Sequence, residues 1–117
     1  MSYEIVRICK IHGIRVTDKS IQYNGSVSIC PKLMKAAGIQ QFEKVQVINL
    51  TNGNRWETYA IETAIKGFTL NGGGARLGEI GDECVIITYA TSETFQPANV
   101  VFVNKDNDIS RTMRYEQ

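Results

Sequence analysis

The chain has 117 residues, of which 43% are hydrophobic and 21% are charged, and its formal net charge is +1. A chain of this length supports a single hydrophobic core, so we expect one domain over residues 1–117. The near balance of charge argues against a nucleic-acid-binding protein with a basic surface and against a protein held at a membrane by basic residues. The apolar runs are also too short to span a bilayer.

Three cysteines, Cys9, Cys30 and Cys84, are odd in number and widely spaced, and the chain has one histidine. They form no Cys-x-x-Cys pair, so the sequence predicts neither a secreted disulfide framework nor a zinc site. The first residues show no basic start followed by an apolar stretch, which predicts no signal peptide. Together these features predict a cytoplasmic protein that uses no metal.

The first extended segment is also the most informative. Residues 5–16 alternate as a strand, with one face made of Val6, Ile8, Lys10, His12, Ile14 and Val16. Lys10 and His12 interrupt this otherwise apolar face, about 6.6 Å apart along the strand, so they can reach a common pocket. The alternative is that this end of the strand emerges into solvent.

Short elements separated by turn residues fill the rest of the chain. Extended segments are expected at 21–23, 26–30, 44–50, 55–61, 68–70, 84–90 and 99–104. Turns or loops are expected at 17–20, 24–25, 51–54, 71–75 and 105–108. A helix of about two turns is expected from Pro31 to Gly38, and the charged tail 111–117 is expected to fray. This pattern predicts a mainly β fold, a small β-barrel with one or two short helices.

Three motifs stand out for their chemistry. Asn24-Gly25-Ser26 puts a hydroxyl beside the peptide of a flexible glycine, although most such pairs are plain turns. Arg55-Trp56-Glu57-Thr58-Tyr59 places Arg55 and Tyr59 on one strand face, suited to carboxylate binding and proton transfer, or else to a solvated barrel rim. Asn71-Gly72-Gly73-Gly74-Ala75 could present backbone N–H groups to an anion, or simply connect two elements.

In order along the chain, these motifs resemble the pyruvoyl-dependent aspartate 1-decarboxylases of bacterial pantothenate synthesis. The resemblance begins at Lys10-Ile11-His12 and continues through Tyr23-Asn24-Gly25-Ser26. It is densest at Asn52-Gly53 and Arg55-Trp56-Glu57-Thr58-Tyr59-Ala60-Ile61, and it extends through Asn71-Gly72 to Gly81-Asp82. It therefore covers nearly the whole chain.

The resemblance implies a double-psi β-barrel and a homotetramer with active sites between neighbouring subunits. It also implies self-cleavage between Gly25 and Ser26 into chains 1–25 and 26–117, by attack of the Ser26 hydroxyl on the Gly25 carbonyl. The same steps convert Ser26 into a pyruvoyl group, so neither pyridoxal phosphate nor a metal is needed. Whether a maturation factor assists is left open.

The implied reaction converts L-aspartate into β-alanine and carbon dioxide. By family analogy, Thr58 stabilises the oxyanion of self-cleavage, Lys10 and Arg55 hold substrate carboxylates, and Tyr59 supplies a proton. The pyruvoyl group and the substrate would be oriented by Asn71, Gly72, Gly73, Gly74 and Ala75. The processing region would be lined by His12, Tyr23 and Asn24.

The sequence departs from the family pattern at a few positions. Gly73 and Gly74 replace two alanines, which predicts a looser loop, Ile48 stands where many relatives have tryptophan, and Gly13 replaces a commonly basic residue. By simple alternation Thr58 faces away from Arg55 and Tyr59, so a shared site needs a bulge, strong twist or different subunits.

Two other functions are alternatives to the enzyme. An unprocessed double-psi barrel could act as a binding or assembly module, for which the glycine-rich segment is the sequence support. A nucleic-acid-binding barrel would need a basic stripe with exposed aromatic residues, which the near-neutral charge disfavours.

Overall fold

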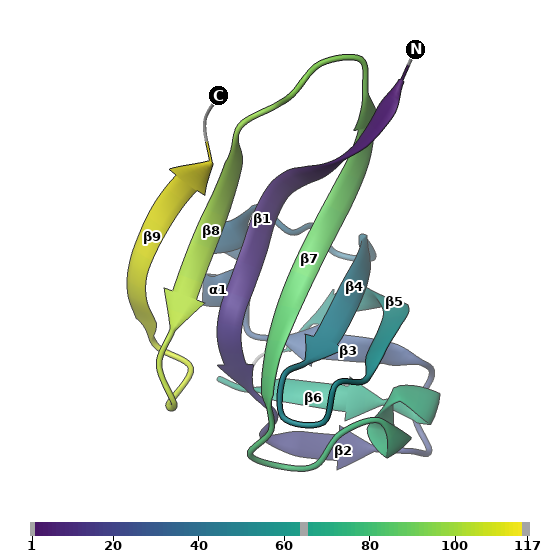
Figure 1. Cartoon of the computed structure of the whole chain (residues 1–117). Coiled ribbons are helices and arrows are strands. Elements are labelled where there is room, and N and C mark those ends of the chain that lie inside the picture. The colour runs from purple at the N-terminus through teal and green to yellow at the C-terminus, as the bar shows by residue number, and fades with distance from the viewer. Residues whose placement is uncertain (1, 64–65, 116–117) are drawn as a thin grey trace.

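A computed structural model describes residues 2–63 and 66–115. Within these ranges the chain is mainly β, with nine strands, one α-helix and one 3-10 helix (Figure 1). The strands are β1 (Tyr3–Arg15), β2 (Asp18–Ser20), β3 (Ser26–Ile29), β4 (Lys44–Asn49), β5 (Arg55–Glu62), β6 (Phe68–Asn71), β7 (Glu83–Ser92), β8 (Ala98–Val103) and β9 (Ile109–Tyr115). The helices are α1 (Pro31–Ala37) and the 3-10 helix η1 (Gly72–Arg76). The expected mainly β fold with short helices is confirmed.

The strands follow the order β2-β6-β3-β5-β4-β7-β1-β8-β9 in one mixed sheet. β1 pairs antiparallel with β7 and parallel with β8, whereas β3 pairs parallel with β5 and antiparallel with β6. The long strands β7, β1, β8 and β9 run steeply across the shorter β3, β6 and β2 (Figure 1). This arrangement is compatible with a small barrel, and barrel closure and the double-psi crossing stay predictions.

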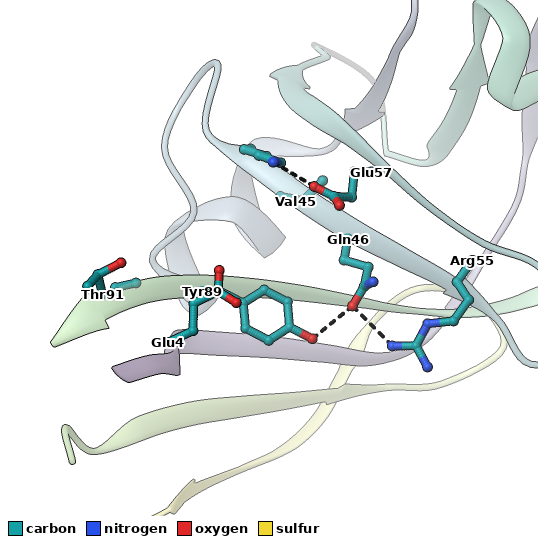
Figure 2. Close-up of a pocket in the computed structure, with 9 residues that line it drawn as sticks. Glu4, Val45, Gln46, Arg55, Glu57, Tyr89 and Thr91 are labelled. Carbon is teal, nitrogen blue, oxygen red and sulfur yellow. Dashed lines mark hydrogen bonds and ion pairs between the residues drawn. The ribbon is translucent and has the colours of Figure 1, made fainter. Parts of the chain in front are cut away.

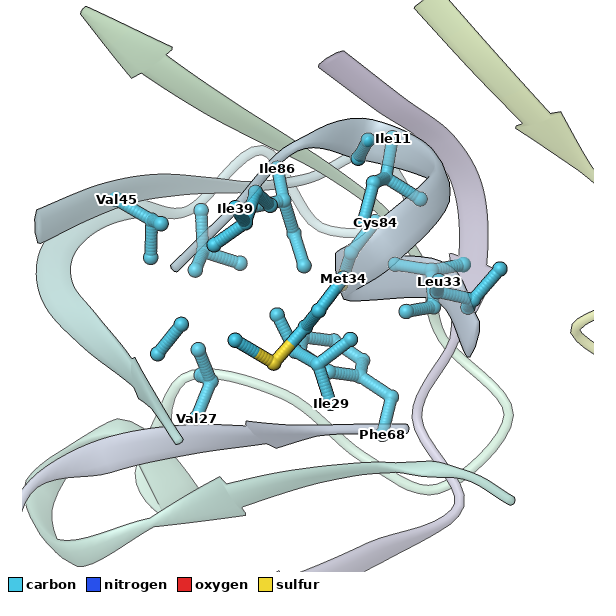
Figure 3. Packing of buried hydrophobic residues seen from close by; sticks show 14 of the residues in the cluster. Ile11, Val27, Ile29, Leu33, Met34, Ile39, Val45, Phe68, Cys84 and Ile86 are labelled. Carbon is cyan, nitrogen blue, oxygen red and sulfur yellow. The ribbon is translucent and has the colours of Figure 1, made fainter. Parts of the chain in front are cut away.

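Helix α1 begins and ends where its sequence predicts. Pro31 lies in the first turn, and Gly38 takes a left-handed conformation (φ 79°) with its N–H bonded to the carbonyls of Met34 and Lys35. Its buried side chains, Leu33 among them, face the sheet (Figure 3). Met34 extends towards the side chains of β3 and β6, so a short helix closes one side of the core.

The first strand corrects the expected alternation. A register shift lies between His12 and Ile14, where Gly13 has a φ of +97°. Because of this bulge, Ile11 and Ile14 both face the core and are fully buried, while Lys10 and His12 lie half-buried on the other side of the sheet. Lys10 and His12 therefore do not interrupt the core face. The side chains of Val6 and Ile8, also assigned to that face, lie outside the described residues.

The bulge also explains why Gly13 cannot be a basic residue here. A Cβ at this position would lie 2.9 Å from the carbonyl oxygen of Val103, and its positive φ is costly for any L-residue with a side chain. The departure from the family pattern at Gly13 therefore accompanies close packing of β1 against the end of β8.

Several other expected elements are wrong, because pairing with a distant strand, and not the local sequence, determines where these strands form. Residues 17–20, expected as a turn, contain β2, which pairs with β6, and residues 21–23, expected as a strand, form the turn after it. The tail expected to fray forms β9 as far as Tyr115, paired with β8, and residues 116–117 lie outside the described residues. Neither helix in the described ranges is long and apolar enough to cross a membrane.

Candidate active site

Ser26 lies at the start of β3, directly opposite Asn71 at the end of β6. Both are nearly inaccessible, with exposed fractions of 2% and 3%. The Asn71 side-chain amide (Nδ2) donates to the Ser26 hydroxyl oxygen at 3.0 Å and to the Ser28 hydroxyl oxygen at 2.9 Å. The Ser26 hydroxyl donates to the backbone carbonyl of Asn24 at 3.1 Å. The Ser26 hydroxyl is thus fixed between a donor and an acceptor, next to the peptide of Gly25.

We call these five residues, Asn24, Gly25, Ser26, Ser28 and Asn71, the Ser26 cluster. Gly72, which begins η1 with a φ of +63°, packs against it. A Cβ on Gly72 would lie 2.7 Å from the Gly25 Cα, 2.8 Å from the Gly25 nitrogen and 3.0 Å from the carbonyl oxygen of Tyr23. The side of Gly25 where its own Cβ would stand is open. The predicted cleavage point therefore contacts the backbone of Gly72 on one side and has open space on the side of the Gly25 Cβ position.

Strand β5 alternates as the sequence predicts. Arg55 and Glu57 are exposed on its outer face and Tyr59 is half-buried there, while Trp56 points inward and packs against the hydrophobic core. Thr58 shares the inward side of the strand with Trp56. Arg55 and Tyr59 therefore lie on one face and Thr58 on the other, without a bulge in β5.

The pairing of β3 with β5 places side chains from both faces of β5 next to the Ser26 cluster. Continuing their parallel register beyond its first pair places Thr58 level with Gly25 and Tyr59 level with Ser26. In the part of the chain that the structure describes, no hydrogen bond joins Thr58 to Gly25 or Ser26. Both residues are nevertheless neighbours of the predicted cleavage point, each on a different face.

Arg55, at the start of β5, lies about 13 Å along the strand from Tyr59. It lines a pocket of about 480 Å³ that includes no residue of the Ser26 cluster. Figure 2 shows Gln46 between Arg55 and Tyr89: its side-chain oxygen accepts from the Arg55 guanidinium at 3.0 Å and from the Tyr89 hydroxyl at 2.8 Å. Because this acceptor is neutral, it does not offset the positive charge of the Arg55 guanidinium, which is available to an anionic ligand. We call this site the Arg55 pocket.

A second cation in the Arg55 pocket is already engaged. The Lys44 ammonium lies 2.6 Å from a Glu57 carboxylate oxygen, and this contact raises the pKa of Lys44 above its ordinary value. Both side chains are more than half exposed, so the ion pair stabilises the fold little. Its consequence is local, since it leaves Arg55 as the cation of this pocket without a carboxylate partner among the hydrogen bonds shown in Figure 2.

Lys10 and His12 lie on the same outer face as Arg55 but across the sheet from it. The register runs from His12 through Val85 and Ile48 to Arg55, a lateral separation of three strand spacings, or about 14 Å. The His12 ring packs against Phe102, with ring centres 5.4 Å apart. The structure therefore brings Ser26, Gly25, Asn24 and Asn71 together, and it keeps Lys10 and His12 apart from them within one chain.

The glycine-rich segment is an ordered 3-10 helix rather than the loose loop expected. Gly73 is exposed, with open space around a Cβ, whereas a Cβ on Gly74 would lie 3.0 Å from the Trp56 indole nitrogen. Ala75 is buried in the core. The two glycines that depart from the family pattern thus differ: Gly74 makes room for Trp56, and Gly73 borders solvent.

Sequence reasoning missed three residues that complete these sites, namely Ser28, Gln46 and Tyr89. Ser28 carries a signal that could have been used, because it lies two residues beyond Ser26 and so shares its strand face. Gln46 and Tyr89 carry no such signal, since they meet Arg55 through the pairing of three strands. None of the three belongs to a motif that the sequence singles out.

Neither cysteine with a described side chain is suited to nucleophilic chemistry. Cys30 and Cys84 are both free and buried. Burial raises the pKa of Cys84 to about 12, so its thiol stays protonated near neutral pH. Among the described residues, no group of three or more His, Cys, Asp or Glu side chains is placed to hold a metal ion.

Comparison with known proteins agrees with these motifs. The model of the family described as aspartate decarboxylase matches residues 1–110. Relatives named Aspartate 1-decarboxylase include one from Campylobacter jejuni, 46% identical over 114 residues, which covers 92% of this chain and 90% of the relative. Another is from Kosmotoga olearia, 44% identical, with 91% of this chain and 96% of the relative covered. A third is from Clostridium novyi, 41% identical, with 92% of this chain and 93% of the relative covered. The chain belongs to the aspartate decarboxylase family.

Proposed function

We propose that this protein decarboxylates L-aspartate to β-alanine and carbon dioxide for pantothenate synthesis in the cytoplasm, with a pyruvoyl group made from its own Ser26. The observation that carries the proposal is the buried Ser26 hydroxyl, held between the Asn71 amide and the Asn24 carbonyl beside the Gly25 peptide. Family membership supports it. An uncleaved barrel serving as a binding or assembly module has no comparable support.

Self-cleavage begins within the Ser26 cluster. The Ser26 hydroxyl oxygen bonds to the Gly25 carbonyl carbon, the peptide C–N bond breaks, and the released amine takes up the hydroxyl proton, which leaves an ester. Thr58, level with Gly25, would donate to the oxyanion that forms on the way. Gly72 would hold Gly25 in place through their backbone contact, since a displaced glycine carbonyl could not be reached.

Two further steps complete the conversion. Loss of the Ser26 Cα proton and cleavage of its Cβ–O bond release the Gly25 carboxylate and leave a dehydroalanine. Water then replaces its nitrogen, which departs as ammonia, so that chain 26–117 begins with a pyruvoyl group and chain 1–25 ends at Gly25. The site fits such a group, because it is small, takes the place of Ser26, and meets the amide donor of Asn71.

When present, the pyruvoyl group supplies a ketone that takes up the substrate amine and a carbonyl that accepts electrons as the carboxylate leaves. The chain's own residues would do the rest. Asn71 would hold the group in place, and Tyr59, level with Ser26, would deliver a proton to the substrate carbon. Arg55 would bind a substrate carboxylate with its unneutralised guanidinium.

The separation of these residues favours sites shared between subunits. Lys10 is on β1, which is separated from β5 by the two strands β4 and β7. Arg55 is about 13 Å along β5 from Tyr59, the residue level with Ser26. A neighbouring subunit of a homotetramer could bring its own Lys10, His12 and Arg55 to the Ser26 cluster. We therefore propose that each site is completed by a second copy of the chain.

Mass measurement under denaturing conditions tests the proposal most directly. We expect two fragments, residues 1–25 and a pyruvoyl-capped 26–117, and conversion of L-aspartate to β-alanine by the cleaved protein. A single species of 117 residues after prolonged warm incubation, with any maturation factor supplied, would contradict the proposal and favour the uncleaved binding module.

A further inference from the structure

Ser28 is a member of the Ser26 cluster to which the proposed chemistry gives no task. We propose that Ser28 is a positioning residue for self-cleavage: its hydroxyl fixes the side-chain amide of Asn71 so that this amide presents one N–H to Ser26. The inference rests on the proposed function, because it concerns how readily Ser26 reacts.

The geometry comes from the pairing of β3 with β6. Asn71 lies opposite Ser26, and Ser28, two residues further along β3, projects from the same face. The Asn71 amide nitrogen carries two hydrogens, and both are used, one on Ser26 at 3.0 Å and one on Ser28 at 2.9 Å. A single nitrogen thus bridges two hydroxyl oxygens on one strand.

The second contact matters because asparagine has a loosely defined side-chain torsion. Rotation about χ2 is broad and roughly two-fold, so one hydrogen bond leaves the amide plane free to turn. With Ser26 and Ser28 both in place, the amide plane is held at two points. Without the Ser28 hydroxyl, Asn71 would turn away or exchange its nitrogen for its oxygen.

The orientation of Asn71 decides the state of the Ser26 hydroxyl. That hydroxyl has one hydrogen, which it donates to the Asn24 carbonyl, so its remaining partner has to be a donor. If Asn71 presented its oxygen instead, it would compete with Asn24 for the hydroxyl hydrogen and rotate the hydroxyl. Ser28 therefore keeps the Ser26 oxygen lone pairs and hydrogen in one arrangement beside the Gly25 peptide.

A pair of variants of equal size separates this role from packing. Ser28→Thr keeps the hydroxyl and Ser28→Val removes it, and both β-branched residues suit a strand. The full chain would be made by cell-free synthesis, and intact mass would be followed over time for the appearance of 26–117. We expect Ser28→Val to cleave about five- to tenfold more slowly than the wild type, in line with loss of one hydrogen bond, and Ser28→Thr to restore most of that rate.

Thr69→Val is the matched control. Thr69 lies opposite Ser28 on β6, and its substitution removes a hydroxyl from the same strand face without removing a partner of Asn71. We expect its cleavage rate to equal that of the wild type. Ser28→Ala, which adds no bulk, gives a second hydroxyl-free variant, and thermal unfolding of each protein shows whether it is folded.

The outcomes separate this inference from the proposed function. Equal rates for Ser28→Val and Ser28→Thr, whether both slow or both normal, would overturn the role of the Ser28 hydroxyl while wild-type cleavage and decarboxylation still uphold the enzyme. A folded Ser28→Ala that cleaves as fast as the wild type would also overturn it. A wild-type chain that never cleaves would end both proposals.

Discussion

The Ser26 cluster and the Arg55 pocket are built on opposite principles. In the cluster, Ser26 and Asn71 are almost fully buried, and the Ser26 hydroxyl and the Asn71 amide nitrogen are held by neighbours at 2.9–3.1 Å. In the pocket, Arg55 is exposed and bound by one neutral acceptor. Backbone rearrangement needs atoms fixed within one chain, whereas a substrate site needs an entrance and an uncommitted charge. Changes in the cluster should therefore alter cleavage, and changes in the pocket should alter only the use of substrate.

The largest effect is expected from Ser26→Ala, which removes the only hydroxyl placed beside the Gly25 peptide in the described cluster. Intact mass should show one uncut chain, and no β-alanine should form from L-aspartate. Ser110→Ala, an exposed serine on β9, is the control and should cleave normally. Cleavage of Ser26→Ala between residues 25 and 26 would refute the assignment of Ser26.

Gly72→Ala should disturb the packing around the cluster without removing any of its polar groups. The new Cβ would sit 2.7 Å from the Gly25 Cα, at a φ of +63°, so we expect a loss of about 2–4 kcal/mol in the free energy of unfolding. Denaturant unfolding in an uncut Ser26→Ala background measures it. Gly73→Ala, on the next residue with open space around it, should cost less than about 0.5 kcal/mol. Equal losses for the two variants would show that the Gly25–Gly72 contact is unimportant.

Arg55→Gln should break the pocket and spare the cluster. Loss of the guanidinium removes charge-assisted hydrogen bonds to a substrate carboxylate, so kcat/KM for L-aspartate should fall about 10–100-fold. The rate of self-cleavage, followed by intact mass, should match the wild type. Slowed cleavage in this variant would mean that the two regions are not independent.

Gln46→Glu should weaken the pocket by charge alone. The new carboxylate would face the Arg55 guanidinium at the position of the present 3.0 Å contact and compete with the substrate carboxylate. Steady-state kinetics should show a KM about tenfold higher, with a smaller change in kcat. Tyr89→Phe, which removes only the hydroxyl bound to Gln46, should raise KM by less. An unchanged KM in Gln46→Glu would argue against Arg55 as a carboxylate ligand.

Gly74→Ala should have a smaller effect than Gly72→Ala, because one neighbouring side chain, that of Trp56, has to shift by a few tenths of an ångström. Its Cβ would lie 3.0 Å from the Trp56 indole nitrogen, which predicts a loss of about 1 kcal/mol in the free energy of unfolding. The double variant Gly74→Ala with Trp56→Phe should recover part of that loss. Additive losses in the double variant would show that Gly74 and Trp56 do not interact.

The parts of the fold that could be predicted depend on neighbours in sequence. Pro31 and Gly38 set the ends of α1, and Asn52-Gly53 marks the turn between β4 and β5. Proline fixes its own φ, and Gly38 and Gly53 readily take the positive φ that the helix end and the turn need, so both signals are local. The failures depend on distant partners: β2 forms because β6 lies beside it, and β9 because β8 does. The bulge at Gly13 likewise accompanies packing against β8, and it overturned the expected face of Lys10 and His12.

By itself, the sequence determined the mainly β class, the helix, the β4–β5 turn and the motifs that carry the chemistry, since periodicity and turn residues act over a few residues. Only the tertiary structure decided which of those motifs meet. It joined Ser26 to Asn71 across 45 positions, added Ser28 to them, and set Arg55 with Gln46 and Tyr89 in a separate pocket. The physical reason is register: one shift of pairing between strands moves every side chain to the other face, and no local pattern records which pairing is chosen.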